Sequence, residues 1–485
     1  MSDTVLNWID GRQTPARGGQ TIPKHDPHSG KIQATLPRSY AEDVDAAVAA
    51  ARTAQPSWAA MTSVARGTLL FEVAKAIREN EALLAETVAK ETGKSLKDAL
   101  GEARGAAQLA EFFAGEGTRL YGRSLQSGTP NKYTHTVRQP LGIAALIVAA
   151  NTPIANVAWK VFPALICGNC AVLKMAEDTP ATGSLFARLA HEAGLPPGVL
   201  NVIHGLGHEA GQALVAHAAV DLISFTGSTK VGRSIAQRAG ERLVRVSLEL
   251  GGKNPLVVCD DADLDNAVKW TVLSSFSNAG QRCAASSRII VFEKVYDEFV
   301  QRLVQKTRTL KIGNTDSDDL GPVINGRQLA GMIEAIEAAR SRGARVLAGG
   351  KRMDDPAHRD GNYLHPTVLG GLARNDDLNN HELFGPVTVV TKAHGFSDAL
   401  EIANSTDFGL TAAIHTRDIN RAVAFGQKIR AGTVNINMGT YGSEPHFPFG
   451  GFGVSGNGSR EPGVEALDVY SELKVISFFS DPASL

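Results

Sequence analysis

The sequence is poor in cysteine. Only four occur among its 485 residues, at Cys167, Cys170, Cys259 and Cys283. Four thiols are too few for the disulfide framework of a secreted protein of this size. We therefore expect reduced thiols and a cytoplasmic location.

The chain also lacks an excess of charge of either sign. Its 49 basic and 50 acidic residues nearly cancel, and residues 1–8 show no basic start followed by an apolar block. A balanced charge creates no field that would attract nucleic acid or an anionic membrane. We expect neither as a partner, and no secretory signal is visible.

Apolar runs long enough to span a membrane are absent as well. Residues 141–159 come closest, but this stretch contains Asn151, Pro153 and Asn156. These residues fit a strand, a turn and a new helix better than a helix in a bilayer. No membrane span is predicted.

No metal centre is indicated. Cys167 and Cys170 have the spacing of a redox or metal half-site, but the sequence offers no second pair. A structural metal site needs about four ligands. We expect two buried thiols near a turn.

Two patterns of secondary structure follow from what is present. The length suggests two or three domains, and residues 40–117 predict a series of helices that opens with an alanine-rich amphipathic run. Short apolar strands and helices then alternate, which is typical of the α/β class with a parallel sheet covered on both faces. Strands are expected at 142–150, 171–175, 199–203 and 222–226, and helices at 156–166, 180–193, 209–217 and 230–239.

Polar residues and glycines follow each predicted strand. Ligands of a parallel sheet bind at the carboxyl ends of its strands, and helix amino termini with unencumbered glycine amides suit phosphate. Gly227, Ser228 and Gly232 are expected to place bare amides at a helix start. The residues after the four strands are, in order, Asn151; Lys174 and Glu177; Gly207 and Gly211; and Phe225, Gly227, Ser228 and Gly232.

Lys174 and Glu177 together suggest a ribose site. The ammonium can donate to sugar hydroxyls and the carboxylate can accept from them. A free Glu177 would repel a 2′-phosphate, so the pair favours NAD over NADP. The alternative is a solvated ion pair.

Cys283 is the candidate nucleophile. It lies in Gly280-Gln281-Arg282-Cys283-Ala284, after Glu249 in Glu249-Leu250-Gly251-Gly252. A thiol that attacks a carbonyl, with a carboxylate that activates water, suggests covalent catalysis in two steps. A buried, inert thiol is the alternative for any single cysteine.

These residues amount to a resemblance. Five motifs look like those of the aldehyde dehydrogenase superfamily, in the family's order and spacing, over essentially the whole chain. They are 247–255, the Cys283 loop, 225–229, 381–386 (His-Glu-Leu-Phe-Gly-Pro) and 448–451 (Pro-Phe-Gly-Gly).

The resemblance implies a three-part subunit that forms a homodimer or homotetramer. Residues 1–118 and 140–250 would form a Rossmann-like NAD-binding domain, and 251–463 an α/β catalytic domain. A small β arm for oligomerisation would combine 119–139 with 464–485, since Lys132–Gln139 and Tyr470–Phe479 have strand-like composition.

It also implies a role for each catalytic residue. Cys283 would attack the aldehyde as thiolate, so its site must favour ionisation. The oxyanion would be held by the Asn151 side-chain amide and the Cys283 N–H. Glu249 would activate water to release a free acid, which argues against acyl transfer to coenzyme A. Lys160 matches a lysine near the proton path of Glu249, although a surface or structural lysine is an equal alternative.

The cofactor residues are carried over in the same way. Glu382 would hold the nicotinamide ribose, and Gly251 would let the backbone pass close to the nicotinamide. Phe384 would position the ring, unless it is ordinary core. Gly207, Gly211 and Ser228 match contacts to the adenosine and pyrophosphate.

The sequence departs from the common family pattern near the substrate. Residues 149–153 read Ala-Ala-Asn-Thr-Pro, so the aromatic residues often found beside the asparagine are missing. Residue 175 is methionine where proline is usual, and the segment 455–461 is one residue longer. All the expected catalytic residues are present, while the entrance to the substrate site is expected to differ from that of common family members.

Arg282 is the clue to the substrate. In some relatives that act on acidic semialdehydes an arginine at this place meets the distal carboxylate, which its planar fork suits. We expect a small-molecule semialdehyde, with α-ketoglutaric semialdehyde as one candidate. An aromatic or medium-chain aldehyde is the main rival, and a structural ion pair of Arg282 away from the substrate is the alternative.

Two other functional classes remain as alternatives. A cysteine hydrolase or esterase could use Cys283 without a cofactor, but it would need a histidine to activate the thiol, and the motif contains none. A binding or structural protein would not require Cys283, Glu249 and Asn151 together.

Overall fold

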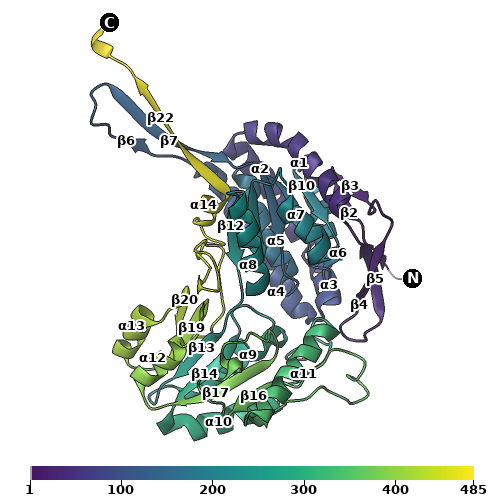
Figure 1. The fold of residues 1–485 in the computed structure, drawn as a ribbon, viewed down its shortest axis with the longest axis vertical. Coiled ribbons are helices and arrows are strands. Elements are labelled where there is room, and N and C mark those ends of the chain that lie inside the picture. The colour runs from purple at the N-terminus through teal and green to yellow at the C-terminus, as the bar shows by residue number, and fades with distance from the viewer. Residues whose placement is uncertain (1–2, 485) are drawn as a thin grey trace.

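The computed structural model describes residues 3–484; residues 1, 2 and 485, which begin and end the predicted segments, lie outside this range. It consists of two α/β bodies and a long arm that projects from the upper body (Figure 1). Each body contains a seven-stranded sheet with helices packed against it. The predicted α/β class is confirmed.

The predicted helical region forms four helices of the upper body. Local caps begin them: Thr62 accepts a hydrogen bond from the Ala65 N–H, and Ser95 accepts one from the Asp98 N–H. Alanine-rich faces let α4 pack closely against α2 and α5. The helices are α1 (Ala41–Ala60), α2 (Ser63–Glu79), α3 (Glu81–Thr92) and α4 (Leu96–Gly115), and η1 (Glu116–Thr118) follows.

The upper sheet has the strand order β12-β11-β8-β9-β10-β2-β3, and its first five strands are parallel. β8, β9 and β10 are buried throughout, as expected for central strands covered on both faces. The strands are β8 (Ile143–Ile147), β9 (Cys170–Lys174), β10 (Leu200–Ile203), β11 (Leu222–Thr226) and β12 (Arg245–Glu249), joined by α5 (Pro153–Ile166), α6 (Pro180–Glu192), α7 (Gln212–Ala216) and α8 (Thr229–Glu241).

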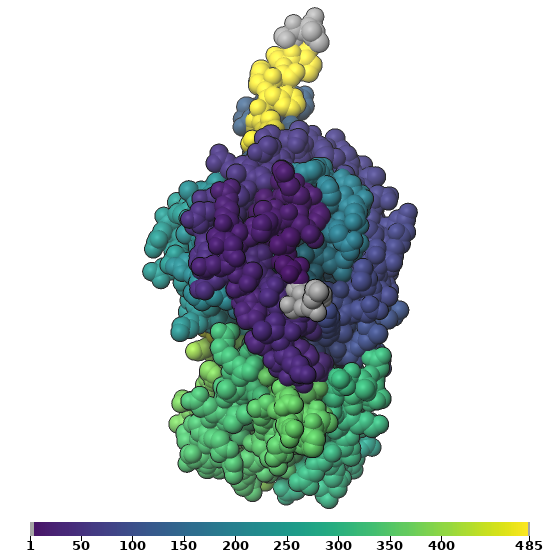
Figure 2. Space-filling model, turned by 90° about the vertical axis from the view of Figure 1, so that its right-hand side faces the viewer, coloured from purple at the N-terminus to yellow at the C-terminus, as the bar shows by residue number. Residues whose placement is uncertain are grey.

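The amino-terminal segment completes the upper sheet and contacts the lower body. The hairpin of β2 (Asn7–Ile9) and β3 (Arg12–Thr14) adds the two antiparallel strands at its edge. This segment, purple in Figure 2, runs down to the lower body, where the Asn362 N–H donates to the Pro27 carbonyl at 2.9 Å. β1 (Asp3–Thr4), β4 (Thr21–His25) and β5 (Ile32–Pro37) form a separate three-stranded sheet.

The lower sheet has the order β15-β16-β17-β14-β13-β19-β20, with only the β15–β16 pair antiparallel. Its strands are β13 (Asn254–Val258), β14 (Ser286–Phe292), β15 (Arg345–Ala348), β16 (Thr367–Gly370), β17 (Val387–Ala393), β19 (Thr411–His415) and β20 (Thr433–Ile436). Its helices are α9 (Leu264–Phe276), α10 (Glu293–Arg308), α11 (Gly326–Ser341), α12 (Phe396–Asn404) and α13 (Ile419–Lys428), with η4 (Asp377–Asn379) and the short pair β18 (Phe408–Gly409) and β21 (Phe452–Gly453) beside them.

The arm is a twisted antiparallel ribbon. β22 (Ser471–Phe479) pairs along its whole length with β7 (Lys132–Pro140), and the short β6 (Ser124–Leu125) pairs on the other side of β7. α14 (Ala466–Tyr470) anchors the ribbon to the upper body, and η5 (Pro482–Ser484) ends it. The two strand-like segments noted in the sequence therefore pair with each other.

Three element boundaries differ from the sequence expectation. The first strand ends at Ile147 instead of 150, so Asn151 lies in a loop. The next helix begins at Pro153, because a proline at the first helical position loses no hydrogen bond. The helix expected at 209–217 is a π-helical turn, Gly207–Gly211, followed by α7.

No helix within residues 3–484 combines the length and apolarity needed to cross a bilayer.

Candidate active site

Two cavities meet at Cys283, between the two bodies. The outer one has a volume of about 520 Å³ and includes Arg282 in its wall; the inner one has a volume of about 390 Å³ and includes Glu249 and Glu382. The thiol is thus approached from two sides. The residues that line both cavities are Asn151, Thr152, Ala155, Trp159, Cys283 and Phe449.

The Cys283 loop is held rigidly by hydrogen bonds to its carbonyls. The Asn254 side-chain amide donates to the Cys283 carbonyl at 2.8 Å, and the Thr440 hydroxyl donates to the Ala284 carbonyl at 2.6 Å. Just before the loop, in η3 (Ser277–Gly280), Asn278 and Ala279 have positive φ angles of 54° and 52°. Such backbone angles are costly outside glycine and are held only by strong surrounding contacts.

Burial raises the pKa of the Cys283 thiol to about 12, and the nearby Glu382 and Glu249 carboxyls act in the same direction. A negative thiolate is disfavoured in a dry site beside two acidic groups. The expectation that this site favours ionisation is therefore wrong for the protein without ligands. The thiol is neutral at pH 7 and must lose its proton during the reaction.

Alkylation of Cys283 by iodoacetamide is expected to be slow at pH 7 and to rise about tenfold per pH unit up to pH 9, because only the thiolate reacts. Mass spectrometry of the peptide that contains Cys283 measures the rate, and Cys283→Ser gives the background. A rate that levels off near pH 7 would contradict the raised pKa.

Glu249 is a buried carboxyl without a hydrogen-bond partner. It ends β12 with 4% of its surface exposed, and neither carboxyl oxygen has a partner among residues 3–484. Burial raises its pKa well above the ordinary value; Glu461 raises it further and Lys160 opposes the shift. A group in this state can take a proton readily once a water molecule reaches it.

Lys160 is neither on the surface nor unpaired. Its ammonium donates to the Glu461 carboxylate at 2.7 Å and to the Ser224 hydroxyl at 2.7 Å, and both charged groups are fully buried. Glu461 also accepts from Ser224 and Ser247, at 2.8 Å each, and from the Tyr470 hydroxyl at 3.0 Å. This saturation of the carboxylate lets the charge pair persist in the core of the upper body.

Sequence reasoning missed Glu461. It lies 301 positions from Lys160 along the chain. Its segment was noted only for its extra length, and nothing local distinguishes Glu461 from an exposed glutamate. Only the folded chain shows that it is the charged partner of Lys160.

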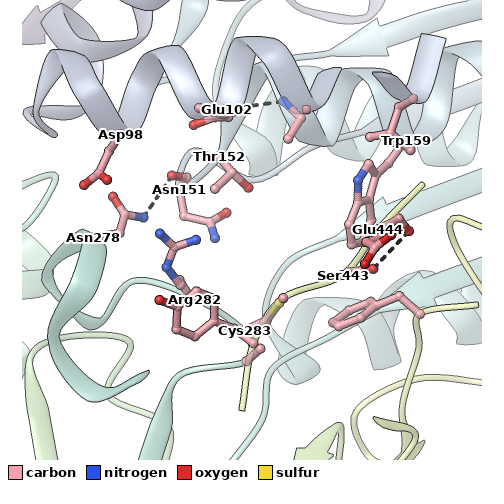
Figure 3. Close-up of a pocket in the computed structure, with 18 of the residues that line it drawn as sticks. Asp98, Glu102, Asn151, Thr152, Trp159, Asn278, Arg282, Cys283, Ser443 and Glu444 are labelled. Atoms are coloured by element: carbon pink, nitrogen blue, oxygen red, sulfur yellow. Dashed lines mark hydrogen bonds between the residues drawn. The ribbon is translucent and has the colours of Figure 1, made fainter. Parts of the chain in front are cut away.

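Asn151 lies beside Cys283 in the wall of both cavities (Figure 3). Its backbone carbonyl accepts from the Lys94 ammonium at 2.8 Å and from the Asn278 side-chain amide at 3.2 Å. Lys94 is itself paired with Glu102 at 2.6 Å, and Glu102 also accepts from the Ile154 N–H at 2.9 Å. The loop before α5 is thus fixed by a buried ion pair that also caps the helix.

The inner cavity is lined by a buried carboxyl, a closely packed glycine and an aromatic ring. Glu382 accepts from the Gly252 N–H at 3.0 Å, and burial raises its pKa to about 7. A Cβ at Gly251 would overlap the Glu382 carboxylate, so glycine lets Glu382 keep this position. Phe384 lines the same cavity with a positive φ of 54°, which marks it as more than ordinary core packing.

The turn after β11 differs from expectation. The Gly227 N–H donates to the Glu249 carbonyl at 3.0 Å and the Gly232 N–H to the Ser228 carbonyl at 2.9 Å, so neither amide is bare. A Cβ at Gly232 would overlap Leu250, and one at Gly227 would overlap the Phe225 ring, so both glycines serve close packing. Ser228, whose hydroxyl accepts a hydrogen bond from the Val231 N–H and caps α8, lines the inner cavity.

Lys174 and Glu177 do form a pair, but not a solvated one. Their charged groups lie 3.6 Å apart, and the Lys174 side chain is buried while Glu177 is a third exposed. Gly207 and Gly211 lie in the π-helical turn, and a Cβ at either would meet nothing within 4 Å. These four residues lie outside the lining of both cavities.

Arg282 points into the outer cavity (Figure 3). Its guanidinium lies over the Tyr441 ring, 5.0 Å from the centroid, and its Nε donates to the Ser277 hydroxyl at 3.3 Å. Within residues 3–484 it forms no ion pair, so the alternative of a structural ion pair fails. Trp159 and Phe449, in edge contact at 5.2 Å, supply an aromatic wall in place of those missing beside Asn151.

The remaining cysteines are free and buried. Burial raises the pKa of Cys167, Cys170 and Cys259 to about 12. Cys167 and Cys170 flank the turn between α5 and β9, as expected. Residues 3–484 contain no cluster of three or more histidine, cysteine or acidic side chains that could hold a metal ion.

Comparison with known proteins agrees with this geometry. Residues 14–476 match the model of the aldehyde dehydrogenase family. The chain is 36% identical to alpha-ketoglutaric semialdehyde dehydrogenase of Bacillus subtilis (98% of each chain covered) and 36% identical to glutarate-semialdehyde dehydrogenase of Pseudomonas putida (97% of this chain, 96% of the relative).

A solved structure agrees in fold as well. Betaine aldehyde dehydrogenase from Staphylococcus aureus, crystallised in complex with NAD⁺, superposes with a TM-score of 0.96 at 32% identity, covering 98% of this chain and 95% of that one. The family match and the superposition both extend over nearly the whole chain. The chain belongs to the aldehyde dehydrogenase family.

Proposed function

We propose that the protein oxidises a semialdehyde, an aldehyde with a carboxylate at its other end, to the free acid with NAD as cofactor. The observation that carries the substrate class is Arg282, an unpaired cation in the wall of the outer cavity directly before Cys283. A planar guanidinium held on an aromatic ring presents its outer N–H groups to a carboxylate. α-Ketoglutaric semialdehyde is one candidate, and the names of the two curated relatives support this class.

The inner cavity suits the nicotinamide end of NAD. Gly251 leaves room beside Glu382, whose carboxylate can accept from ribose hydroxyls, and the first turn of α8 offers free amides for the pyrophosphate. Lys174 and Glu177 are the proposed ribose pair on the adenine side, with Gly207, Gly211, Phe225 and Ser228 nearby in the proposed site. When bound, NAD accepts the hydride that the aldehyde carbon loses.

Cys283 supplies the nucleophile. Its proton passes to solvent, the sulfur attacks the aldehyde carbon, and the electron pair of the C=O bond moves to the oxygen, which becomes an oxyanion. The Asn151 side-chain amide and the Cys283 N–H are the proposed donors to it, which is worth about a hundredfold or more in rate per donor. Once the carbon is oxidised, the acyl group is held on Cys283 as a thioester.

Glu249 and the buried pair complete the cycle. Glu249 takes a proton from water, the resulting hydroxide attacks the thioester, and Cys283 leaves as thiolate. The Lys160–Glu461 pair lies close enough to shift the pKa of Glu249, which supports its placement on the path by which that proton leaves.

The geometry supports an NAD-dependent dehydrogenase over a cofactor-free hydrolase. A cofactor-free cysteine hydrolase normally pairs its cysteine with a histidine, and histidine is absent from the lining of both cavities. The aromatic wall of Trp159 and Phe449 keeps an aromatic or medium-chain aldehyde as the rival substrate.

Arg282→Ala is expected to lower kcat/KM for an acidic semialdehyde about a hundredfold, while a neutral aldehyde of equal length loses about threefold or less. Arg282→Lys keeps the charge but not the planar fork and should fall between. Lys97→Ala, which removes another cation from the same cavity wall, is the matched control. Equal losses on both substrates would discard the semialdehyde proposal.

Glu177→Gln is expected to lower the preference for NAD over NADP by about tenfold, because the repulsion between its carboxylate and a 2′-phosphate is lost. The ratio of kcat/KM for the two cofactors measures this. Glu192→Gln, which neutralises an exposed carboxylate at the end of α6, should leave the ratio unchanged. An unchanged ratio in Glu177→Gln would refute the cofactor assignment.

The arm supports a homodimer or homotetramer. Four of its apolar side chains are between 52% and 69% exposed: Leu473, Val475, Phe478 and Phe479. A projecting ribbon rarely exposes this much apolar surface to water unless another subunit covers it. Four free thiols agree with a reduced compartment, and we place the enzyme in the cytoplasm.

A further inference from the structure

The side-chain amide of Asn151 is held at both ends. Its nitrogen donates to the Gln281 carbonyl at 3.0 Å, and its oxygen accepts from the Asn156 side-chain nitrogen at 3.2 Å. The Gln281 side chain is fixed in turn, since it accepts from the Ile324 N–H at 2.9 Å and donates to the Asn278 carbonyl at 3.2 Å. The amide is therefore oriented before any ligand arrives.

This arrangement leaves one N–H group for a substrate. An amide nitrogen carries two hydrogens, and Gln281 receives one of them. The orientation of the amide plane sets the direction of the second N–H group. If that plane turned by half a revolution, the Asn151 nitrogen would face the donor nitrogen of Asn156, and two N–H groups would oppose each other. Asn156 thus determines which end of the Asn151 amide can reach an oxyanion.

Asn156 is a buried polar residue that lines the inner cavity and whose side-chain hydrogen bonds go to the loop of Asn151. It lies in the first turn of α5 between the buried apolar side chains of Ile154 and Val157, and only 7% of its surface is exposed. A buried amide is costly unless it is hydrogen-bonded, and asparagine is a weak helix former. Its side-chain nitrogen has two acceptors, the Ala149 carbonyl at 3.1 Å and Asn151, and both belong to the loop before the helix.

We infer that Asn156 is a positioning residue that aligns the Asn151 amide for the oxyanion formed at Cys283. The inference rests on the proposed role of Asn151. Donors that are oriented in advance stabilise developing charge without reorganising during the reaction, and this is where most of their catalytic benefit arises. Asn156 touches neither reacting atom and acts only through Asn151.

The test is a double-mutant cycle in which the rate of the first turnover is measured. Asn156→Leu, Asn151→Ala and the double variant are mixed with NAD and a saturating aldehyde, and the rate of the first NADH formation is measured by stopped flow. Asn156→Leu should slow this step about tenfold, and Asn151→Ala about a hundredfold. In the Asn151→Ala background the leucine should cost about twofold or less, because residues that act through one group are not additive. Asn156 also lines the inner cavity, so NAD is kept saturating for every variant.

Two further variants separate positioning from folding. Val157→Ala disturbs the packing of the same helical turn but keeps both amides, so it should lower Tm while leaving the first turnover within about twofold. Asn156→Asp has nearly the same shape but places a carboxylate against the Asn151 oxygen, and it should slow the first turnover at least as much as leucine. This variant provides the test if Asn156→Leu does not fold.

Each result has a distinct meaning. Full additivity in the cycle, or a wild-type first turnover in Asn156→Asp, would overturn the positioning role. A wild-type rate in Asn151→Ala would overturn the proposed oxyanion role itself. A slow Asn151→Ala with an unaffected Asn156→Leu would remove only the inference about Asn156.

Discussion

Cys283→Ser is expected to lower NADH formation on the order of 10⁴-fold or more while NAD binds as before. The hydroxyl of serine is a far weaker acid than a thiol, and this site already opposes an anion at position 283: burial and two carboxyls raise the pKa of the thiol to about 12. Burial and the two carboxyls would also raise the pKa of a serine hydroxyl, which is already higher than that of a thiol in water. The side chain is also nearly isosteric, so the two cavities should keep their shape.

Steady-state NADH formation and calorimetric titration with NAD together measure this result. Cys259→Ala is the matched control, because Cys259 is a buried thiol at the end of β13 and lines neither cavity. It should leave both quantities close to wild type. Turnover above about a tenth of the wild-type rate in Cys283→Ser would mean that another group attacks the aldehyde.

Glu249→Gln should preserve the first turnover and slow all later ones by about 10² to 10⁴. The carboxylate is assigned to thioester hydrolysis, which follows hydride transfer, so one equivalent of NADH per active site should still appear rapidly. The amide has the same shape and cannot take a proton from water. A pre-steady-state burst followed by a slow phase is therefore the expected trace, and the acylated Cys283 should be visible in the intact mass.

The pH dependence provides an independent check. The pKa of Glu249 lies well above its ordinary value in this site, and a general base must be ionised to act. The fraction of ionised Glu249 grows as the pH rises towards that pKa, so the wild-type slow phase should accelerate with pH over this interval, while that of Glu249→Gln should not show this rise. Glu241→Gln, which changes an exposed carboxylate at the end of α8, is the control. A Glu249→Gln enzyme with wild-type steady-state turnover would contradict the assigned role.

Much of the fold could be predicted because its signals are local. Buried parallel strands appear as short apolar runs, and β9, β10 and β11 fall within one residue of the predicted bounds. The motifs around Glu249 and Cys283 are likewise contiguous in sequence. The strand before Asn151 was predicted too long because Val148 and two alanines continue the apolar run, although the chain has already left the sheet.

The rest of the site depends on contacts between distant segments. Glu461 and Lys160 are 301 positions apart, and the sequence around either residue does not indicate a buried ion pair. Lys94 and Glu102 lie only 8 positions apart, yet Lys94 also donates to the carbonyl of Asn151, 57 positions away along the chain. The raised pKa of Cys283 also depends on distant segments, because it results from burial and from the carboxyls of Glu382 and Glu249.

The two cavities impose an order on the events at Cys283. Arg282 lines only the outer cavity, and Glu249 lines only the inner one. The acyl group would remain on the Arg282 side after oxidation, whereas Glu249 lies on the side proposed for the nicotinamide. A nicotinamide bound there would occupy space beside Glu249 that a water molecule needs. Hydrolysis is therefore expected to be slow until that side is empty, so the same cavity would serve hydride transfer first and the entry of water second.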